Sequence, residues 1–193
     1  MSIWKDQGPA KKDAAPPPSE PVTSTFRDAP AAADFSPAVT APPGTRAEVL
    51  LTLDEVAVLP ASHPLARQRR LQLEDFAGEY FVSLSADDPY RRLIDARFAE
   101  AGVARTLRME THSAAAVCAM VQQGLGVSIV NPLTALAMSS PKLKVRPLTN
   151  AIAFHVGILL PQIAAPHPLR SALVDAIAKA ASDMERELTT GVS

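Results

Sequence analysis

Short hydrophobic blocks alternate with amphipathic segments from about Ala47 to the end of the chain. The blocks predict strands, and segments whose apolar residues recur at helical spacing predict helices. The sequence predicts strands at residues 56–59, 80–84, 107–110, 127–130, 143–146 and 154–160. It predicts helices at residues 71–76 (a short helix or turn), 89–101, 114–123, 132–138 and 168–188.

The order of these elements indicates an α/β fold. Strands and helices alternate between residues 80 and 138, which favours a parallel sheet with right-handed crossovers. In the helix at 89–101, Ile94 and Phe98 share a buried face, and we expect Arg91 and Arg92 to lie on a solvated face. Two predicted strands separate the final helix from this unit, so we expect that helix to cover a different sheet.

Residues 1–46 differ in composition from the rest of the chain. They hold nine of the 18 prolines and few large apolar side chains. A segment of this kind cannot bury enough apolar surface to offset its conformational entropy. We therefore predict a disordered Pro/Ala-rich tail at 1–46 and a folded domain at 47–188.

Charge and motif content exclude several functional classes. A formal net charge of −1 is unlike that of a wholly basic nucleic-acid binder. One cysteine rules out a disulfide framework, and no CxxC or HxxxH spacing suggests a metal, so no cofactor is expected. The GxSxG, GxxxxGK[ST] and HExxH motifs are missing, so we do not expect an enzyme. No signal peptide or membrane span is recognisable, which favours a cytoplasmic protein.

Three strand-to-helix junctions carry the informative polar chemistry. They are residues 83–89, residues 110–113 and the pair Asn131-Pro132. Asp88 before Pro89 suits a helix N-cap, and Asn131 repeats that arrangement. In a parallel sheet the three junctions meet at one edge, where α/β proteins bind ligands and where helix N-termini favour an anionic group.

The junctions offer partners for a molecule that carries both a carboxylate and an amine. Asp87 and Glu110 are candidates to receive the cationic group. Neutral hydrogen-bond partners are the hydroxyls of Ser83, Ser85, Thr111 and Ser113. The alternative is that Asp88, Ser113 and Asn131 only cap helices, as any such unit requires.

Two further residues have two possible roles at this stage. His112 lies beside a helix start and could contact a ligand, or it could cap or pack. Cys118 fits a small core residue better than a nucleophile. A hydrolase using Ser113 or Cys118 is the least favoured hypothesis.

Two long runs of this sequence resemble the effector-binding domain of LysR-type transcriptional regulators. They are ETHSAAAVCAMVQQGLGVSIVNPLTAL at 110–136 and VAVLPASHPLA at 56–66, and the loop DPYRR at 88–92 fits the same group. The resemblance covers roughly residues 48–180 and is closest to regulators of lysine biosynthesis and of opine and basic amino-acid catabolism.

This resemblance implies a type 2 periplasmic-binding-protein-like fold with an effector cleft between two α/β subdomains. One complete parallel-sheet subdomain is expected at about 80–155, and part of the other, including Val56–Leu59, at 47–79 and 156–188. The effector contacts implied by the family come from the loops after the strands. They are Ser83, Ser85, Asp88, Thr111, His112, Ser113 and Asn131.

The family's N-terminal helix-turn-helix and most of its first subdomain have no counterpart in these residues. We therefore expect a sensing domain, or a truncated remnant, that binds an amino-acid-like carboxylate. Expected partners are that effector and a second copy or a full-length regulator, with operator DNA reached only through the missing domain. The alternative is a ligand-free interaction or dimerisation module.

Overall fold

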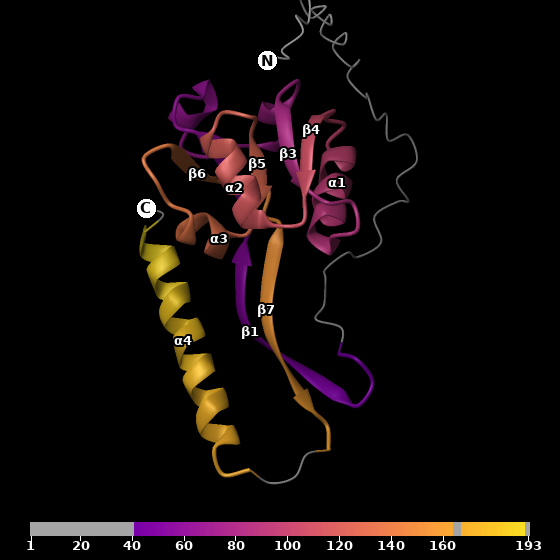
Figure 1. Ribbon diagram of the computed structural model, residues 1–193, viewed down its shortest axis with the longest axis vertical. Coiled ribbons are helices and arrows are strands. Elements are labelled where there is room, and N and C mark those ends of the chain that lie inside the picture. The colour runs from indigo at the N-terminus through magenta and orange to yellow at the C-terminus, as the bar shows by residue number, and fades with distance from the viewer. Residues whose placement is uncertain (1–40, 164–166, 192–193) are drawn as a thin grey trace, which may run out of the picture.

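The structure is a computed structural model that describes residues 41–163 and 167–191, without the side chains of residues 187–191. It has a rounded α/β unit, from which a long two-stranded ribbon and a helix extend together (Figure 1). The tail expected at 1–46 lies outside the described residues except at its end. There, strand β1 already begins at Thr45, two residues before the expected domain boundary.

The α/β unit contains five strands in the spatial order β4-β3-β5-β2-β6. Strands β5 (Ser128–Val130), β2 (Val56–Pro60) and β6 (Leu143–Pro147) form one sheet, and β3 (Tyr80–Leu84) pairs with β4 (Thr106–Thr111). A parallel bridge between Phe81 and Val127 joins the two groups. The helices are α1 (Pro89–Glu100), α2 (Ala114–Gln122) and α3 (Pro132–Ala137). Short 3-10 turns lie at Pro64–Arg67 and Leu73–Phe76.

Strand β2 differs from the expected arrangement in place and in direction. It was expected in the partial first subdomain, yet it lies inside the α/β unit, between β5 and β6, and pairs antiparallel with both. Its apolar residues Val56, Ala57, Val58 and Leu59 are all buried, which an internal strand covered on both faces requires. The α/β fold class is as predicted, and the sheet is mixed, because β3, β4, β5 and β6 run in one direction and β2 runs against them.

The core forms two apolar layers, one on each face of the sheet. On the α1 side, the rings of Phe76, Phe81 and Phe98 meet edge to face with centroids 5.7–6.1 Å apart. On the α2 side, Val82 packs among the other buried residues. Cys118, fully buried in α2, belongs to this second layer, as the sequence predicted. Alternation along β3 therefore sends Phe81 and Val82 to opposite layers.

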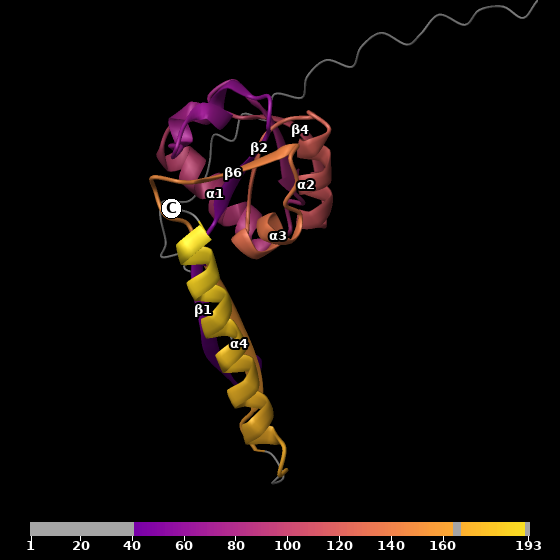
Figure 2. The same ribbon diagram turned by 90° about the vertical axis from the view of Figure 1, so that its left-hand side faces the viewer.

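The ribbon pairs β1 (Thr45–Asp54) antiparallel with β7 (Ala153–Pro161), and helix α4 (Arg170–Gly191) runs along it (Figure 2). Strand β1 was not predicted, whereas β7 and α4 were. The apolar side chains of α4 are largely open to solvent, since Leu173 is 61% and Met184 40% exposed. No helix in the described ranges is long and apolar enough to cross a membrane.

Candidate functional site

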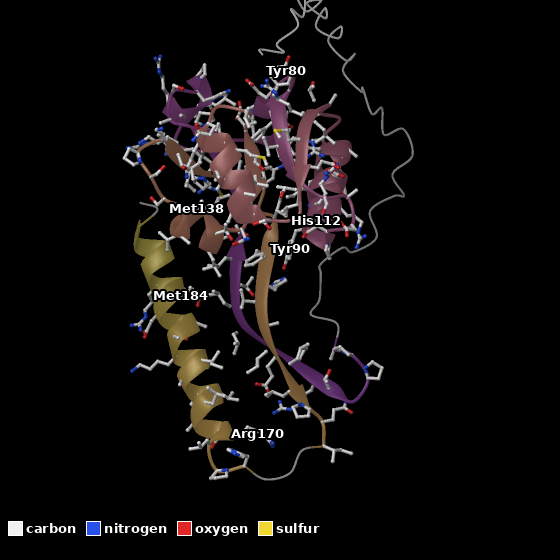
Figure 3. All side chains as sticks on the ribbon, viewed as in Figure 1. Tyr80, Tyr90, His112, Met138, Arg170 and Met184 are labelled. Carbon is white, nitrogen blue, oxygen red and sulfur yellow. The ribbon has the colours of Figure 1, made fainter. Side chains whose placement is uncertain are left out.

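The strand directions bring the predicted junctions to one edge of the α/β unit, which we call the strand-end rim. It consists of residues 85–88 after β3, 111–113 after β4, 131 after β5, and Glu55 immediately before β2. Strands β3, β4 and β5 are parallel and end there, and β2 begins there because Val56 pairs with Val130. The rim faces the ribbon, with His112 and Tyr90 near it and Tyr80 at the opposite end of the unit (Figure 3).

Helix α1 begins at the rim with a negatively charged cap. The Asp88 carboxylate accepts the backbone N–H groups of Tyr90 at 2.8 Å and Arg91 at 3.1 Å. Pro89 occupies the first helical position, where no N–H is needed. Asp88 thus occupies the end of α1 that would otherwise attract an anion, so this part of the rim favours a cation.

Helices α2 and α3 begin at the rim with neutral caps. The Ser113 hydroxyl accepts the N–H of Ala116 at 3.4 Å, and Thr111 Oγ1 accepts the N–H of Ser113 at 3.4 Å. Asn131 Oδ1 accepts the N–H of Thr134 at 2.8 Å. The capping roles considered for Ser113 and Asn131 are therefore present in the structure. A neutral cap leaves the positive end of α2 available to an anionic group.

Ser85 and His112 connect the loops after β3 and β4. Ser85 Oγ lies 2.8 Å from Nδ1 of His112, and the backbone N–H of Ser85 donates to Thr111 at 3.0 Å. A hydrogen bond from the Ser85 side chain holds the pKa of the exposed Asp87 carboxyl below its usual value, and His112 adds to this effect.

This group does not have the geometry of a hydrolytic triad. In a triad the serine and the carboxylate contact opposite nitrogens of the imidazole ring. Here Ser85 and Asp87 both face Nδ1 of His112, at 2.8 and 3.9 Å. Burial raises the pKa of the Cys118 thiol to about 11, which keeps it protonated at neutral pH and disfavours it as a nucleophile.

Ser83 contrasts with the other predicted contacts. It lies within β3 with only 3% of its surface exposed, so it offers no open hydroxyl in this structure. Of the other predicted residues, His112 and Ser113 are exposed. The partly exposed ones are Ser85, Asp88, Thr111 and Asn131.

The expectation that Arg91 lies on a solvated face was wrong. Arg91 is 3% exposed, and its guanidinium contacts Asp95 at 2.8 Å and Glu110 at 2.6 Å. It also donates to the Leu84 carbonyl at 2.7 Å. Glu110 is therefore already paired with an internal cation, which leaves it less suited to the cationic group of a ligand than expected.

Glu55 is the rim residue that sequence reasoning missed. It is 2% exposed, and its backbone N–H donates to the Ile152 carbonyl at 2.8 Å. Burial raises its pKa to about 8, and the nearby Asp88 carboxylate adds to the shift. The available signal in the sequence was an isolated acidic residue before an apolar strand. Glu55 could be assigned to the rim only once β2 was known to run antiparallel to β5, because that direction brings the start of β2 to the end of β5.

Metal chemistry finds no support in the described part of the chain. No group of three or more His, Cys, Asp and Glu side chains there could hold a metal ion. The polar groups of the rim are hydroxyls, an imidazole, backbone N–H groups and carboxylates. Such a set is suited to hydrogen-bonding a small charged molecule.

Residues 32–182 match the family model described as the LysR substrate-binding domain. The chain belongs to this family. It is 50% identical over 135 residues to the transcriptional activator protein LysR of Escherichia coli K12, which covers 70% of this chain and 42% of that protein. It is 32% identical over 139 residues to the regulatory protein NocR of Agrobacterium tumefaciens T37, covering 70% and 46%.

A solved structure agrees in fold. The effector-binding domain of QuiR, in complex with shikimate, superposes with a TM-score of 0.60 at 22% identity, covering 73% of this chain and 67% of that one. The family resemblance and the fold class are thus confirmed. The chain spans less than half the length of LysR and NocR, so its match is to one part of those regulators.

Proposed function

We propose that this LysR-type domain senses an amino-acid-like carboxylate, such as a basic amino acid or its derivative, at the strand-end rim. The observation that carries the proposal is the convergence of three capped helix starts and Glu55 at one edge of the sheet. Ligands of α/β sheets bind at such edges. We keep the seven effector contacts proposed from the sequence, and Ser83 is the buried one among them.

The rim is electrically asymmetric in a way that matches a zwitterion. At the start of α2, the neutral Ser113 cap and the adjacent Thr111 suit a carboxylate, which would take the place of the exposed Asp87 beside His112. At the start of α1, Asp88 supplies negative charge and suits an ammonium group. The starts of α1 and α2 thus suit opposite charges, so one small molecule can place its ammonium group at α1 and its carboxylate at α2.

The comparisons support a carboxylate effector by analogy. The QuiR domain, which shares this fold, is described in complex with shikimate, itself a carboxylate. The identity with LysR and NocR supports a regulatory role. We propose that operator DNA is reached through a separate helix-turn-helix domain and a second subunit, in the cytoplasm, and that the domain catalyses no reaction.

Effector binding is proposed to act on the junction between the α/β unit and the ribbon. A ligand shifts such an equilibrium only by its differential affinity for the two states. The junction contains a direct link, because the Tyr90 hydroxyl of α1 meets the backbone of His155 in β7. A ligand at the start of α1 therefore touches the element that holds the ribbon.

Isothermal titration calorimetry tests the sensing function. Lysine, arginine, diaminopimelate and opines are titrated into protein shown to be folded by circular dichroism. Binding of at least one, weakened by Ser85→Ala and not by Ser139→Ala, is the expected result. Ser139 is exposed after α3 and offers a matched serine away from the proposed contacts. Heat-silent titrations with every compound would overturn the sensing proposal.

A second candidate function is an interaction module without a ligand, and the exposed stripe of α4 favours it. Leu173 is more than half exposed, and Ile177 and Met184 are 36% and 40% exposed. Exposed apolar stripes of this kind often mark association surfaces. Co-elution with a full-length LysR-type regulator, without any ligand-induced change in melting temperature, would favour this role over sensing.

A further inference from the structure

The buried carboxyl of Glu55 has an unsatisfied oxygen. Within the part of the chain that the structure describes, Oε2 of Glu55 contacts neither solvent nor a hydrogen-bond partner. The backbone at this residue is fixed, because its N–H donates to the Ile152 carbonyl and the next residue, Val56, begins strand β2. A buried carboxyl without a partner is costly, so its presence at the rim needs an explanation.

The charged surroundings of Glu55 are negative. Asp88, the cap of α1, acts on Glu55 as a like charge. Burial raises the pKa of Tyr90, in the first turn of α1, and both carboxylates add to that shift. No ion pair joins Glu55 to a cation anywhere in residues 41–163 or 167–186. The two acidic groups therefore lie together with no cation of the described residues beside them, and one of them is buried with an unpartnered oxygen.

We propose that Glu55 and Asp88 form a subsite for the cationic group of the effector, which we call the cation subsite. The inference rests on the proposed sensing function and specifies its chemistry, since it requires a primary ammonium or guanidinium group. The carboxylate of the same molecule then lies at the start of α2, beside His112 and Ser113. An arriving cation replaces the proton on Glu55, and that proton passes to solvent.

Burial decides whether the Glu55 carboxyl carries a proton. Burial raises its pKa to about 8, so the carboxyl is neutral in the empty protein at pH 7. An adjacent cation favours the ionised form and lowers that pKa. Effector binding is therefore coupled to proton release. A Glu55 satisfied only by a buried water molecule would show no such coupling.

The first experiment follows the Glu55 side-chain carboxyl carbon by isotope-edited NMR, with Glu55→Gln to assign the resonance. The probes are methylammonium, diaminopimelate, and pimelate, which keeps both carboxylates and lacks the amines. Methylammonium and diaminopimelate are expected to shift the Glu55 titration to lower pH, whereas pimelate is not. A titration unchanged by both amines would overturn the cation subsite.

The second experiment measures diaminopimelate affinity in two variants and a control. Glu55→Gln keeps the shape of the protonated side chain, and Asp88→Asn keeps a good helix cap, so both retain the fold. Each is expected to weaken binding about tenfold to a hundredfold, the range for a charged hydrogen bond. Glu100→Gln, a change of equal size in the last turn of α1, is expected to leave binding unchanged. Equal affinity of wild type and both variants would contradict the proposal.

The two proposals can fail separately. If methylammonium shifts the Glu55 titration while no amino acid binds, the cation subsite stands and the sensing function is wrong. If an effector binds and Glu55 does not respond to it or to methylammonium, the sensing function stands and the cation subsite is wrong.

Discussion

Arg91 in the first turn of α1 forms an ion pair with Glu110 on the neighbouring strand β4, with Nη1 and Oε1 2.6 Å apart. The same guanidinium contacts Asp95 one helical turn later, and Arg105 also pairs with Asp95. Arg105 lies over the ring of Phe98, 4.2 Å from its centroid. This network ties the start of α1 to β4 next to the rim.

The network predicts a large cost for removing Arg91. Arg91→Met is expected to lower the free energy of unfolding by about 1–3 kcal/mol, because it removes charged hydrogen bonds to Glu110 and to the Leu84 carbonyl, while Asp95 keeps its pairing with Arg105. Urea denaturation followed by circular dichroism measures the change. Arg92→Met is the matched control, because Arg92 is exposed, and its effect is expected within about 0.5 kcal/mol. Similar losses in both variants would contradict a structural role for the network.

Local chemistry explains what was predictable from the sequence. A helix cap involves residues two or three positions apart, so Asp88-Pro89 and Asn131-Pro132 identified the starts of α1 and α3 without any tertiary information. Helical periodicity likewise placed Ile94 and Phe98 in the core. Helix caps and helical periodicity depend on residues that are close together in the sequence, so both can be recognised without the structure.

Long-range pairing explains what was not predictable. Strand β1 mixes polar and apolar residues, and its partner β7 lies about a hundred positions away. The direction of β2 is fixed by its pairing with β5, which nothing in the residues of β2 specifies. Arg91 looked solvated because its partner Glu110 is on another element. Glu55 was missed for the same reason, since only the direction of β2 brings it to the rim.

Gly126 is required by a close approach of two backbone segments. A Cβ added there would lie 2.4 Å from the Tyr80 carbonyl oxygen, and that oxygen accepts the N–H of Val127 at 2.8 Å and cannot easily move. Gly126→Ala is expected to cost about 3 kcal/mol or more in the free energy of unfolding. Thermal and urea unfolding would measure it.

Gly102 provides the comparison for this prediction. It has a positive φ of 67° but open space around it, so Gly102→Ala carries only the backbone strain, about 1–2 kcal/mol. Equal effects at both glycines would show that contact with Tyr80 is not what requires Gly126.

The raised pKa of Glu55 predicts how stability depends on pH. The carboxyl titrates near 4.5 when unfolded and near 8 when folded, so between these values the folded state binds one more proton. The free energy of unfolding should therefore fall as pH rises through this window, with a contribution of up to about 1.4 kcal/mol per pH unit. Urea midpoints measured from pH 5 to pH 8 are the test. Glu55→Gln should remove that contribution, and an unchanged slope in the variant would contradict the raised pKa.

Tyr90 links the α/β unit to the ribbon through its hydroxyl. Its oxygen accepts the N–H of His155 at 3.1 Å and lies 3.4 Å from the His155 carbonyl, while its ring packs 5.0 Å from Phe154. Tyr90→Phe removes the hydrogen bonds and keeps the ring contact, so we expect a loss of about 1 kcal/mol. Hydrogen exchange at the His155 amide should accelerate, and unchanged protection there would show that the hydroxyl does not hold the junction.

Ser113 combines a structural role with the proposed contact to the effector carboxylate. Its hydroxyl accepts the N–H of Ala116 at 3.4 Å, a longer bond than the 2.8 Å bond to Asn131, so Ser113→Ala should cost about 0.5–1 kcal/mol in stability. Asn131→Ala should cost more, about 1–2 kcal/mol. Calorimetry separates capping from binding, because Ser113→Asp retains a cap and adds a negative charge where the carboxylate is proposed. Ser113→Asp should therefore keep stability and lose effector binding, whereas a variant that binds normally would place the carboxylate elsewhere.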